Sequence, residues 1–455
     1  MTKIWISLKE GVADAKQAGR WPFYALLICL AALAIRFPGE WDSDTVDQHA
    51  QVLSGIYRDW HPPVFAAFWR LVNSVWNGLT GMRVTGSGVL YIVHAAMLWG
   101  GLALMLRAAK PFLRSFVGLP RWKLALFSGV LLFFGLFEMV PITRFIFKDT
   151  AMMAGYVLAL GLMLNFPKSV PGKALVCPVC LLLLFYGTAV RHNALFALIP
   201  MLALLLLRIR PGLSPRLLAS GVLAIWAALL FGINQVNYGV LKAEKQYPLQ
   251  EIIFTDFWKL NYKTGTFDLP PLPAGRSWDP LTEDVFFRFY NKKPVYIQMS
   301  FAFINEYYAG QGAPVLHHDF SEDPRAFDEL RSAWMDKIIR QFGAYLGIHK
   351  KIFVDLLREY SFMGFTGALY FAAGLLLVAT GFALLIRKKG NEPAPYLVAL
   401  SGLLYVLPYA AAVPDIQRRY LFWFFFAVAF GLSWALVSLL RVNAGGVLPK
   451  IQTGV

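Results

Sequence analysis

Long apolar runs, separated by short polar clusters, dominate the pattern of this chain. About 20 apolar residues suffice to cross a bilayer as a helix, and ten runs approach or exceed that length. We therefore predict an all-α polytopic membrane protein with about ten transmembrane helices. The runs lie at residues 21–37, 88–106, 122–141, 150–166, 174–190, 194–207, 217–235, 362–386, 394–413 and 420–440.

An eleventh apolar stretch, Val64 to Leu79, does not fit this series. It is 16 residues long and carries Arg70, Asn73 and Asn77 at intervals. A segment so short and so polar predicts a helix that lies at the membrane surface.

A second surface helix is predicted just upstream, because residues 44–57 separate into two faces at helical spacing. The apolar face carries Val46, Ala50, Leu53, Ile56 and Tyr57, and the opposite face carries Asp44, Gln48 and Gln51. We expect the carboxylate and the amides to point away from lipid.

The composition and the placement of charge agree with these helices. The 455 residues are 57% hydrophobic and 15% charged, with a mean hydropathy of +0.52, which is not the composition of a soluble globular protein. With ten spans and a cytoplasmic N-terminus, the inner segments hold 19 of the 43 Lys and Arg residues and three acids, which leaves 24 basic and 24 acidic residues elsewhere. The net charge of +16 then lies on the cytoplasmic side, as is typical of membrane proteins. The basic charge therefore predicts two cytoplasmic termini and contact with membrane lipids, and nucleic acid is not needed to explain it.

This topology divides the chain into three parts. They are an N-terminal transmembrane module (1–235) with a first outer loop (38–87), an extracytoplasmic cap (236–361) and a C-terminal transmembrane module (362–455). The cap is too long to lack structure of its own, and its second half has helical periodicity. No small-residue cleavage site follows the first apolar run, so we expect a retained helix. Cys177 and Cys180 have no partner His or Cys nearby and are interpreted as buried small residues, not as a metal or redox motif.

Four polar clusters interrupt the apolar runs, and the predicted topology places all four on the outer face. They are Glu40, Asp42, Asp44 and Asp47 with His61; Lys148, Asp149 and Thr150; Arg191, His192 and Asn193; and Asp415, Arg418, Arg419 and Tyr420. Any one of them would fit an ordinary helix end with caps and snorkelling bases. Four on one face favour a functional site, because carboxylates near an apolar span are costly and mark chemistry.

The residue types suggest a reaction at a lipid phosphate. The planar fork of Arg gives paired donors to phosphate oxygens. A carboxylate opposite the phosphate would take the proton of an incoming hydroxyl while the phosphate leaves a sugar carbon. The clusters therefore predict transfer of a sugar from a lipid phosphate.

The same clusters carry a family resemblance. The motifs are FPG-x-x-x-S-D-x-x-x-Q ending at Gln48, the turn His61-Pro62-Pro63, KDT at 148–150, R-x-N at 191–193 and D-x-x-R-R-Y at 415–420. In these the chain resembles the GT-C membrane glycosyltransferases, which include protein O-mannosyltransferases, the lipid A aminoarabinose transferase and O-antigen-modifying glucosyltransferases. The resemblance implies an inverting transferase of the bacterial cytoplasmic membrane. It would move a sugar from a polyprenyl-phosphate donor to a hydroxyl of an envelope glycan such as lipopolysaccharide, a lipid or a protein, at the periplasmic or exterior face.

The resemblance also implies roles for individual residues. Asp44 matches the first-loop acid that acts as base or orients the acceptor, and Asp42 is the second candidate. Lys148, Arg418 and Arg419 are candidates for the lipid phosphate. The remaining substrate-binding candidates are Gln48, His61, Asp149, Arg191, His192, Asn193, Asp415 and Tyr420. His61 has a structural alternative, because the two prolines after it set the start of a helix.

We expect no metal or other cofactor. Asp42 and Asp44 with His61 would be the place for Mg²⁺ or Mn²⁺, but carboxylate sites for these ions usually have more ligands than are visible here.

Two other functions stay open at this point. A transporter or lipid flippase would also line its pathway with charge, although such proteins often show internal repeats and ionisable groups deep in their helices. An envelope glycan ligase or polymerase would share the fold and differ in its donor.

Overall fold

The computed structural model describes residues 30, 37–115, 144–268, 271, 324–362, 364–386, 392–411 and 417–443, which are mostly helical. The first helices are α3 (Ser43–Ser54), α4 (Pro63–Thr80), α5 (Gly88–Ser115), α7 (Lys148–Leu164), α8 (Val170–Ala189), α9 (Ala194–Ile209), α10 (Pro215–Asn234), the π-helix η1 (Gln235–Val240) and α11 (Leu249–Thr264). They are followed by α14 (Pro324–Arg340), α15 (Phe342–Glu359), strands β1 (Ser361–Phe362) and β2 (Phe365–Thr366), α16 (Gly367–Ile386), α17 (Ala394–Val406), the 3₁₀ turns η3 (Leu407–Ala410) and η4 (Arg418–Leu421), and α18 (Phe422–Asn443).

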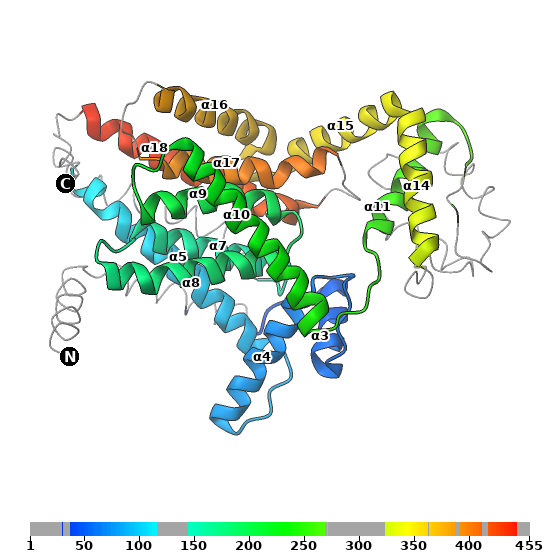
Figure 1. Cartoon of the computed structure of the whole chain (residues 1–455), viewed down its shortest axis with the longest axis horizontal. Coiled ribbons are helices and arrows are strands. Elements are labelled where there is room, and N and C mark those ends of the chain that lie inside the picture. The colour runs from blue at the N-terminus through cyan, green and yellow to red at the C-terminus, as the bar shows by residue number, and fades with distance from the viewer. Residues whose placement is uncertain are drawn as a thin grey trace.

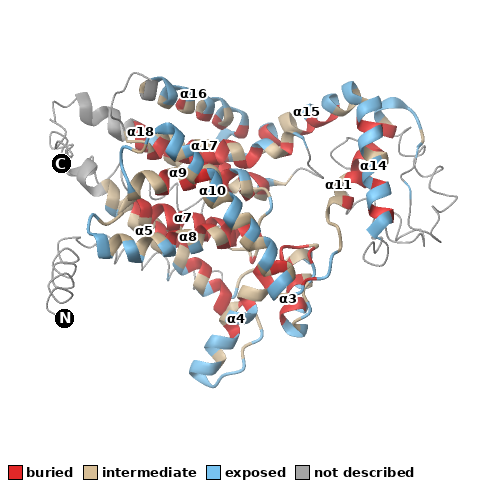
Figure 2. Ribbon diagram, viewed as in Figure 1, coloured by how far each residue is buried: buried red, intermediate tan, exposed pale blue. Residues whose placement is uncertain are grey.

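Most of the described apolar helices form a bundle (Figure 1); its members are α5, α7, α8, α9, α10, α16, α17 and α18. Helix α5 packs on α7, α7 on α8, and α17 on both α9 and α18. The buried residues concentrate in α7, α9 and α17 at the centre of the bundle, whereas α10 and α16 are largely exposed (Figure 2). The site described below lies at one end of this bundle.

Helices α5 and α7 approach closely through two glycines. A Cβ atom at Gly101 would lie 2.6 Å from the backbone carbon of Val157, and one at Gly161 would lie 2.6 Å from the carbonyl oxygen of Gly101. Small residues that let helix backbones meet are typical of helix packing in membranes.

Within the described residues, four helices are long and apolar enough to cross a membrane. They are Gly88–Ala109, Val170–Ala189, Pro215–Val240 and Gly367–Leu384. Large apolar side chains on their surfaces are exposed, among them Leu182, Phe231 and Leu376. Such surfaces are costly in water and suit contact with lipid.

The number of ten spans stays a prediction. Two predicted spans, 21–37 and 122–141, lie outside the described residues, apart from residues 30 and 37. Two others form apolar helices that are too short by themselves, Ala194–Ile209 and Ala394–Ala410. A 16-residue helix rises only about 24 Å, less than the apolar thickness of a bilayer.

The eighth predicted span begins later than its apolar run suggested. Residues Ser361 to Thr366 form a two-stranded antiparallel hairpin before α16 starts at Gly367. Gly364, at the turn, has a φ of +80°, which side chains other than glycine rarely adopt.

The segment 38–87 contains helices at both positions predicted for surface helices, and one of them is oriented differently from an ordinary amphipathic helix. In α3 the polar residues Gln48 and Gln51 are buried against the protein, while Val46 and Leu53 are 57% and 56% exposed, and Ile56, just after the helix, is 56% exposed. The amides therefore point away from the apolar face as predicted, but into the protein and not into water.

Helix α4 extends away from the bundle (Figure 1). Its first half is buried at Phe65 and Trp69, and its second half exposes Leu71, Val75 and Leu79. It is not among the described helices that are suited to cross a membrane.

The described part of the cap consists of α11, α14 and α15, with a small core of its own around Phe254, Trp258 and Leu330. The predicted helical stretch 323–359 is broken at Gln341 into α14 and α15. The apolar face shifts at this break, so that Phe342 is exposed and Ile352 is buried.

Candidate functional site

A short backbone pairing holds the start of α3 against the start of α7. The amide of Glu40 donates to the carbonyl of Arg144 (2.8 Å), the amide of Ile146 donates to the carbonyl of Glu40 (3.1 Å), and the Glu40 and Arg144 side chains form an ion pair. Because Asp44 and Lys148 follow these residues closely, the pairing brings two polar clusters about a hundred residues apart in sequence into contact.

Asp42 starts helix α3. Its Oδ1 accepts hydrogen bonds from the backbone amide of Thr45 (2.8 Å) and from the Thr45 hydroxyl (2.7 Å), and its backbone is extended as expected of an N-cap. Its other oxygen, Oδ2, accepts from Arg419 at 3.2 Å. Asp42 therefore uses its carboxylate to cap α3. This structural role distinguishes it from Asp44, whereas the D-x-D motif alone could not tell the two acids apart.

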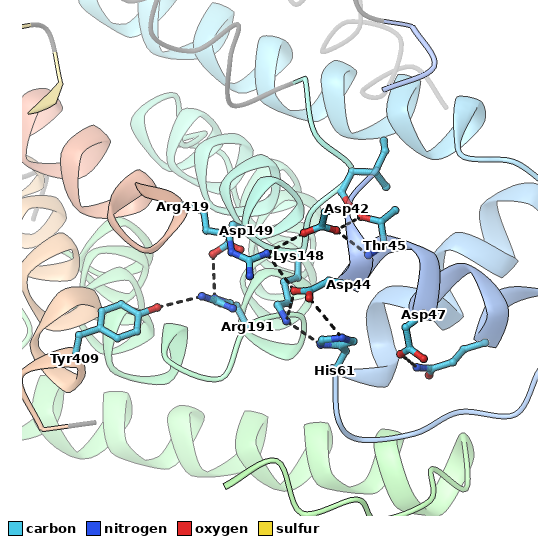
Figure 3. Close-up of polar contacts among 12 residues, drawn as sticks. Asp42, Asp44, Thr45, Asp47, His61, Lys148, Asp149, Arg191, Tyr409 and Arg419 are labelled. Atoms are coloured by element: carbon cyan, nitrogen blue, oxygen red, sulfur yellow. Dashed lines mark hydrogen bonds and ion pairs between the residues drawn. The ribbon is translucent and has the colours of Figure 1, made fainter. Parts of the chain in front are cut away.

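Asp44, in the first turn of α3, is held by two cations (Figure 3). Its Oδ2 lies 3.3 Å from Nζ of Lys148 and 3.1 Å from Nη1 of Arg419. Its Oδ1 lies 3.9 Å from Nε2 of His61, which is beyond hydrogen-bond distance, and accepts no hydrogen bond from the part of the chain that the structure describes. One oxygen of Asp44 is therefore doubly paired, and the other is available to a ligand.

His61 completes this group from the segment before α4. Its Nδ1 lies 2.9 Å from Nζ of Lys148, so the ammonium donates and the imidazole nitrogen accepts. Asp59 anchors the segment, because its carboxylate accepts from the Tyr238 hydroxyl (2.7 Å) and from the Gln246 amide (2.5 Å).

The surroundings lower the pKa of both Asp44 and His61, which favours the charged form of the carboxylate and the neutral form of the imidazole. Burial raises the pKa of Asp44, but Lys148, His61 and Arg419 together outweigh it and hold that pKa well below its usual range. Burial, reinforced by the Lys148 ammonium, lowers the pKa of His61 to about 3. At neutral pH the site therefore holds an ionised Asp44 beside a neutral imidazole.

A second ion pair lies behind the first. Oδ1 of Asp149, a fully buried residue, lies 3.0 Å from Nε of Arg191. Nη2 of Arg191 donates to the Tyr409 hydroxyl at 3.1 Å, and Nδ2 of Asn193 donates to the same oxygen at 2.5 Å. Arg191 also lies over the ring of Tyr420, with 5.2 Å from the guanidinium carbon to the ring centroid. These contacts point inward and favour a supporting role for Asp149, Arg191 and Asn193.

The structure therefore brings residues from all four clusters together around one group of charges. Three carboxylates face three cations in it: Asp42, Asp44 and Asp149 with Lys148, Arg191 and Arg419. Such a group suits an anionic ligand that competes with the carboxylates for the cations.

Some predicted residues lie apart from this group or beside it. Arg418 is exposed and donates to the carbonyl of Ser361 at 3.3 Å. His192, in the turn between α8 and α9, lies near Lys148 and Arg191, and burial together with these two cations lowers its pKa to about 4. Gln48 is buried on α3 one turn after Asp44, on the same face, and its Nε2 has no hydrogen-bond partner in the part of the chain that the structure describes. Asp415 lies outside the described residues.

Sequence reasoning missed Tyr405 and Tyr409. The Tyr405 hydroxyl lies 3.4 Å from Oδ1 of Asp149, and the Tyr409 ring stacks on that of Tyr420. Both tyrosines end an apolar run and were counted there as apolar. Their spacing of four residues on one helical face, at the outer end of a span, is the signal that could have indicated them.

A separate polar cluster in the cap was missed as well. Nε2 of the buried His349 lies 3.0 Å from Oδ1 of Asp256, whose Oδ2 accepts from the Trp334 indole at 3.1 Å. The cluster ties α11 to α14 and α15 and has the partners of a structural network.

Among the described residues, no group of three or more His, Cys, Asp or Glu side chains is placed to hold a metal ion. Asp44 and Asp42 have cations as neighbours instead. Cys177 and Cys180 are free, and Cys180 is buried.

Comparison with known proteins adds no relative: no protein-family model, curated protein or solved structure matches the chain.

Proposed function

We propose that this chain is an inverting glycosyltransferase similar to the GT-C membrane enzymes. It moves a sugar from a polyprenyl-phosphate donor to a hydroxyl of a cell-envelope glycan, lipid or protein. In this proposal the protein crosses the bacterial cytoplasmic membrane about ten times with both termini inside. The first outer loop then carries the base, and the cap covers a pocket at the outer face.

The observation that carries the proposal is the meeting of Asp44, Lys148 and Arg419. They come from three separate segments and meet at one end of an apolar helix bundle, with 3.1 and 3.3 Å between the carboxylate and the two cations. A phosphate needs cations, and a hydroxyl nucleophile needs a carboxylate beside them. The apolar exterior of the bundle suits a donor with a prenyl chain.

The distribution of charge favours chemistry at one end of the bundle over passage through it. In the described spans and shorter apolar helices, His94 of α5 is buried away from either end, but every Asp, Glu, Lys and Arg lies within four residues of an end of the apolar segment. Examples are Lys173, Arg208 and Arg216. A transporter or flippase typically places ionisable groups near mid-membrane.

The reaction would proceed in one displacement. The acceptor oxygen attacks the anomeric carbon from the side opposite the phosphate, and its proton passes to Asp44. The bond between the anomeric carbon and the phosphate oxygen breaks, its electron pair stays on the phosphate, and prenyl phosphate leaves beside Lys148 and Arg419. The sugar arrives with inverted configuration.

The test compares two matched variants, Asp44→Asn and Asp42→Asn, in purified protein in detergent. Radiolabelled sugars on a short prenyl phosphate serve as a donor panel, envelope fractions serve as acceptor, and label that no longer extracts into butanol measures transfer. We expect Asp44→Asn to lower the rate by about 10²- to 10⁴-fold. The amide introduced by Asp42→Asn keeps an oxygen for the N-cap and loses one partly exposed ion pair, so we expect this variant to lower the rate less than about tenfold.

Two outcomes would count against the proposal in different ways. No transfer by the wild-type protein from any donor would refute the glycosyltransferase. Transfer with equal loss in both variants would keep the activity and refute the assignment of Asp44 as the base.

A further inference from the structure

Lys148 and Arg419, the cations assigned to the phosphate, both contact one oxygen of Asp44, the residue assigned as the base. Nζ of Lys148 and Nη1 of Arg419 lie 3.3 and 3.1 Å from the same oxygen, Oδ2 of Asp44. A carboxylate in this position cannot act well as a base, because protonation would have to overcome its attraction to two neighbouring cations. In the ligand-free protein, Lys148 and Arg419 are therefore paired with Asp44 and not free to bind a phosphate.

The cations that contact Asp44 could contact a phosphate instead. A carboxylate and a phosphodiester both carry anionic oxygens that accept from the guanidinium of Arg and the ammonium of Lys. Two buried donors close by have no hydrogen-bond partner among the described residues, Nε of Arg419 and Nε2 of Gln48. A buried donor without a partner is costly, and a further anionic oxygen would satisfy it.

We infer that Asp44 occupies the place of the donor phosphate in the ligand-free protein, and that the arriving phosphodiester displaces it and so releases it as the base. This inference rests on the proposed function. Three carboxylates balance three cations before binding, so an added phosphate anion competes with Asp44 for Lys148 and Arg419 and leaves the site with one excess negative charge. Uptake of a proton by Asp44 removes that excess. The carboxylate that gives way is the one that then needs to accept a proton.

The displacement would tie basicity to the presence of the donor. Once Lys148 and Arg419 pair with the phosphate, they no longer stabilise the charge on Asp44, and the nearby phosphate anion opposes that charge. Burial of Asp44 then acts to raise its pKa without the opposing cations. Asp44 accepts the acceptor's proton only when the leaving group is in place.

The test measures whether removing the charge of Asp44 strengthens the binding of a phosphodiester. The probe is farnesyl methyl phosphate, a phosphodiester that does not titrate near neutral pH, and binding to the detergent-solubilised full chain is followed by calorimetry. If Asp44 competes with the phosphate, Asp44→Asn binds the probe about tenfold more tightly than wild type, although it has lost its base. Asp47→Asn is the matched control, because Asp47 is on the same helix and bonds Gln51 (2.9 Å) instead of the cations. We expect the control to change affinity less than twofold.

A second measurement needs only the wild-type protein and covers the case of a variant that fails to fold. Binding enthalpies in buffers of different ionisation enthalpy report the protons taken up on binding. At about pH 5 we expect net proton uptake, because both Asp44 and His61 lose the influence of Lys148.

The outcomes separate this inference from the function on which it rests. Probe binding that is weakened or unchanged in Asp44→Asn, or that occurs without proton uptake, would overturn the displacement and leave the transferase standing. A probe that binds neither the wild type nor the variant, together with no sugar transfer, would overturn both.

Discussion

Removing one member of the Asp149–Arg191 pair is expected to destabilise the protein more than removing both. Asp149 is fully buried, and its Oδ1 lies 3.0 Å from Nε of Arg191. At that distance and an effective dielectric constant of about 20, the two charges attract by about 5 kcal/mol. Arg191→Met leaves Asp149 as a buried charge without its ion partner, and we expect a loss of about 3–5 kcal/mol in unfolding free energy.

The double variant Asp149→Leu with Arg191→Met tests the reason for this loss. It leaves no uncompensated charge, so we expect it to recover at least half of the stability that Arg191→Met alone loses. Stability is measured in detergent as the fraction of monodisperse protein that survives heating, followed by size-exclusion chromatography. Arg340→Gln is the control, because Arg340 pairs with Asp336 on the surface, where both side chains are about two-thirds exposed, and should cost less than about 1 kcal/mol. A double variant at least as unstable as Arg191→Met alone would refute the coupling between Asp149 and Arg191. An Arg191→Met variant as stable as wild type would refute the supporting role of the pair.

Two further predictions follow from the site and the bundle. The pKa of His61 is about 3 in the folded protein and about 6.5 when unfolded, so its contribution to stability is complete above about pH 6.5 and is lost as the pH falls toward 3. In His61→Gln, the stability lost between about pH 6 and pH 4 should shrink by up to about 1.4 kcal/mol per pH unit, and an identical pH dependence in wild type and variant would contradict a neutral His61. A Cβ at Gly101 would lie 2.6 Å from the backbone of α7, whereas one at Gly100 would have no atom within 4 Å. Gly101→Ala should therefore lower thermal stability by about 1–3 kcal/mol, and Gly100→Ala should not. Equal effects of the two substitutions would contradict the close packing of α5 on α7.

The helices of the described bundle could be predicted from sequence because apolar length is a local property. The same holds for the start of α4 after two prolines. The ends of helices were predicted less well where apolar residues continue past them. Apolar residues run on through the hairpin before α16. Gly343 is the nearest glycine to the break between α14 and α15 at Gln341, but it lies inside α15 and does not mark where the helix ends.

The partners within the site could be predicted only to the level of a shared face. Arg419 contacts Asp44 across 375 residues, and no local pattern specifies which of two adjacent arginines turns inward. The 3₁₀ turn η4 decides this, since it directs Arg419 to the carboxylates and leaves Arg418 exposed. Likewise, the choice between Asp42 and Asp44 depends on the residue at which α3 begins, because the N-cap uses its carboxylate for the backbone.

The amphipathic pattern of helix α3 did not by itself indicate which of its two faces is buried in the protein. Its polar face is the buried one, and its apolar residues Val46 and Leu53 are more than half exposed. In water this arrangement would expose apolar surface and bury amides at a cost. At a membrane surface, where we propose that α3 lies, the same arrangement is favourable, because the exposed face would meet lipid while the buried face carries Asp44 into the site. A helix built this way places a charged group next to the lipid boundary without exposing that charge to it, as a reaction at the phosphate of a lipid-linked sugar requires.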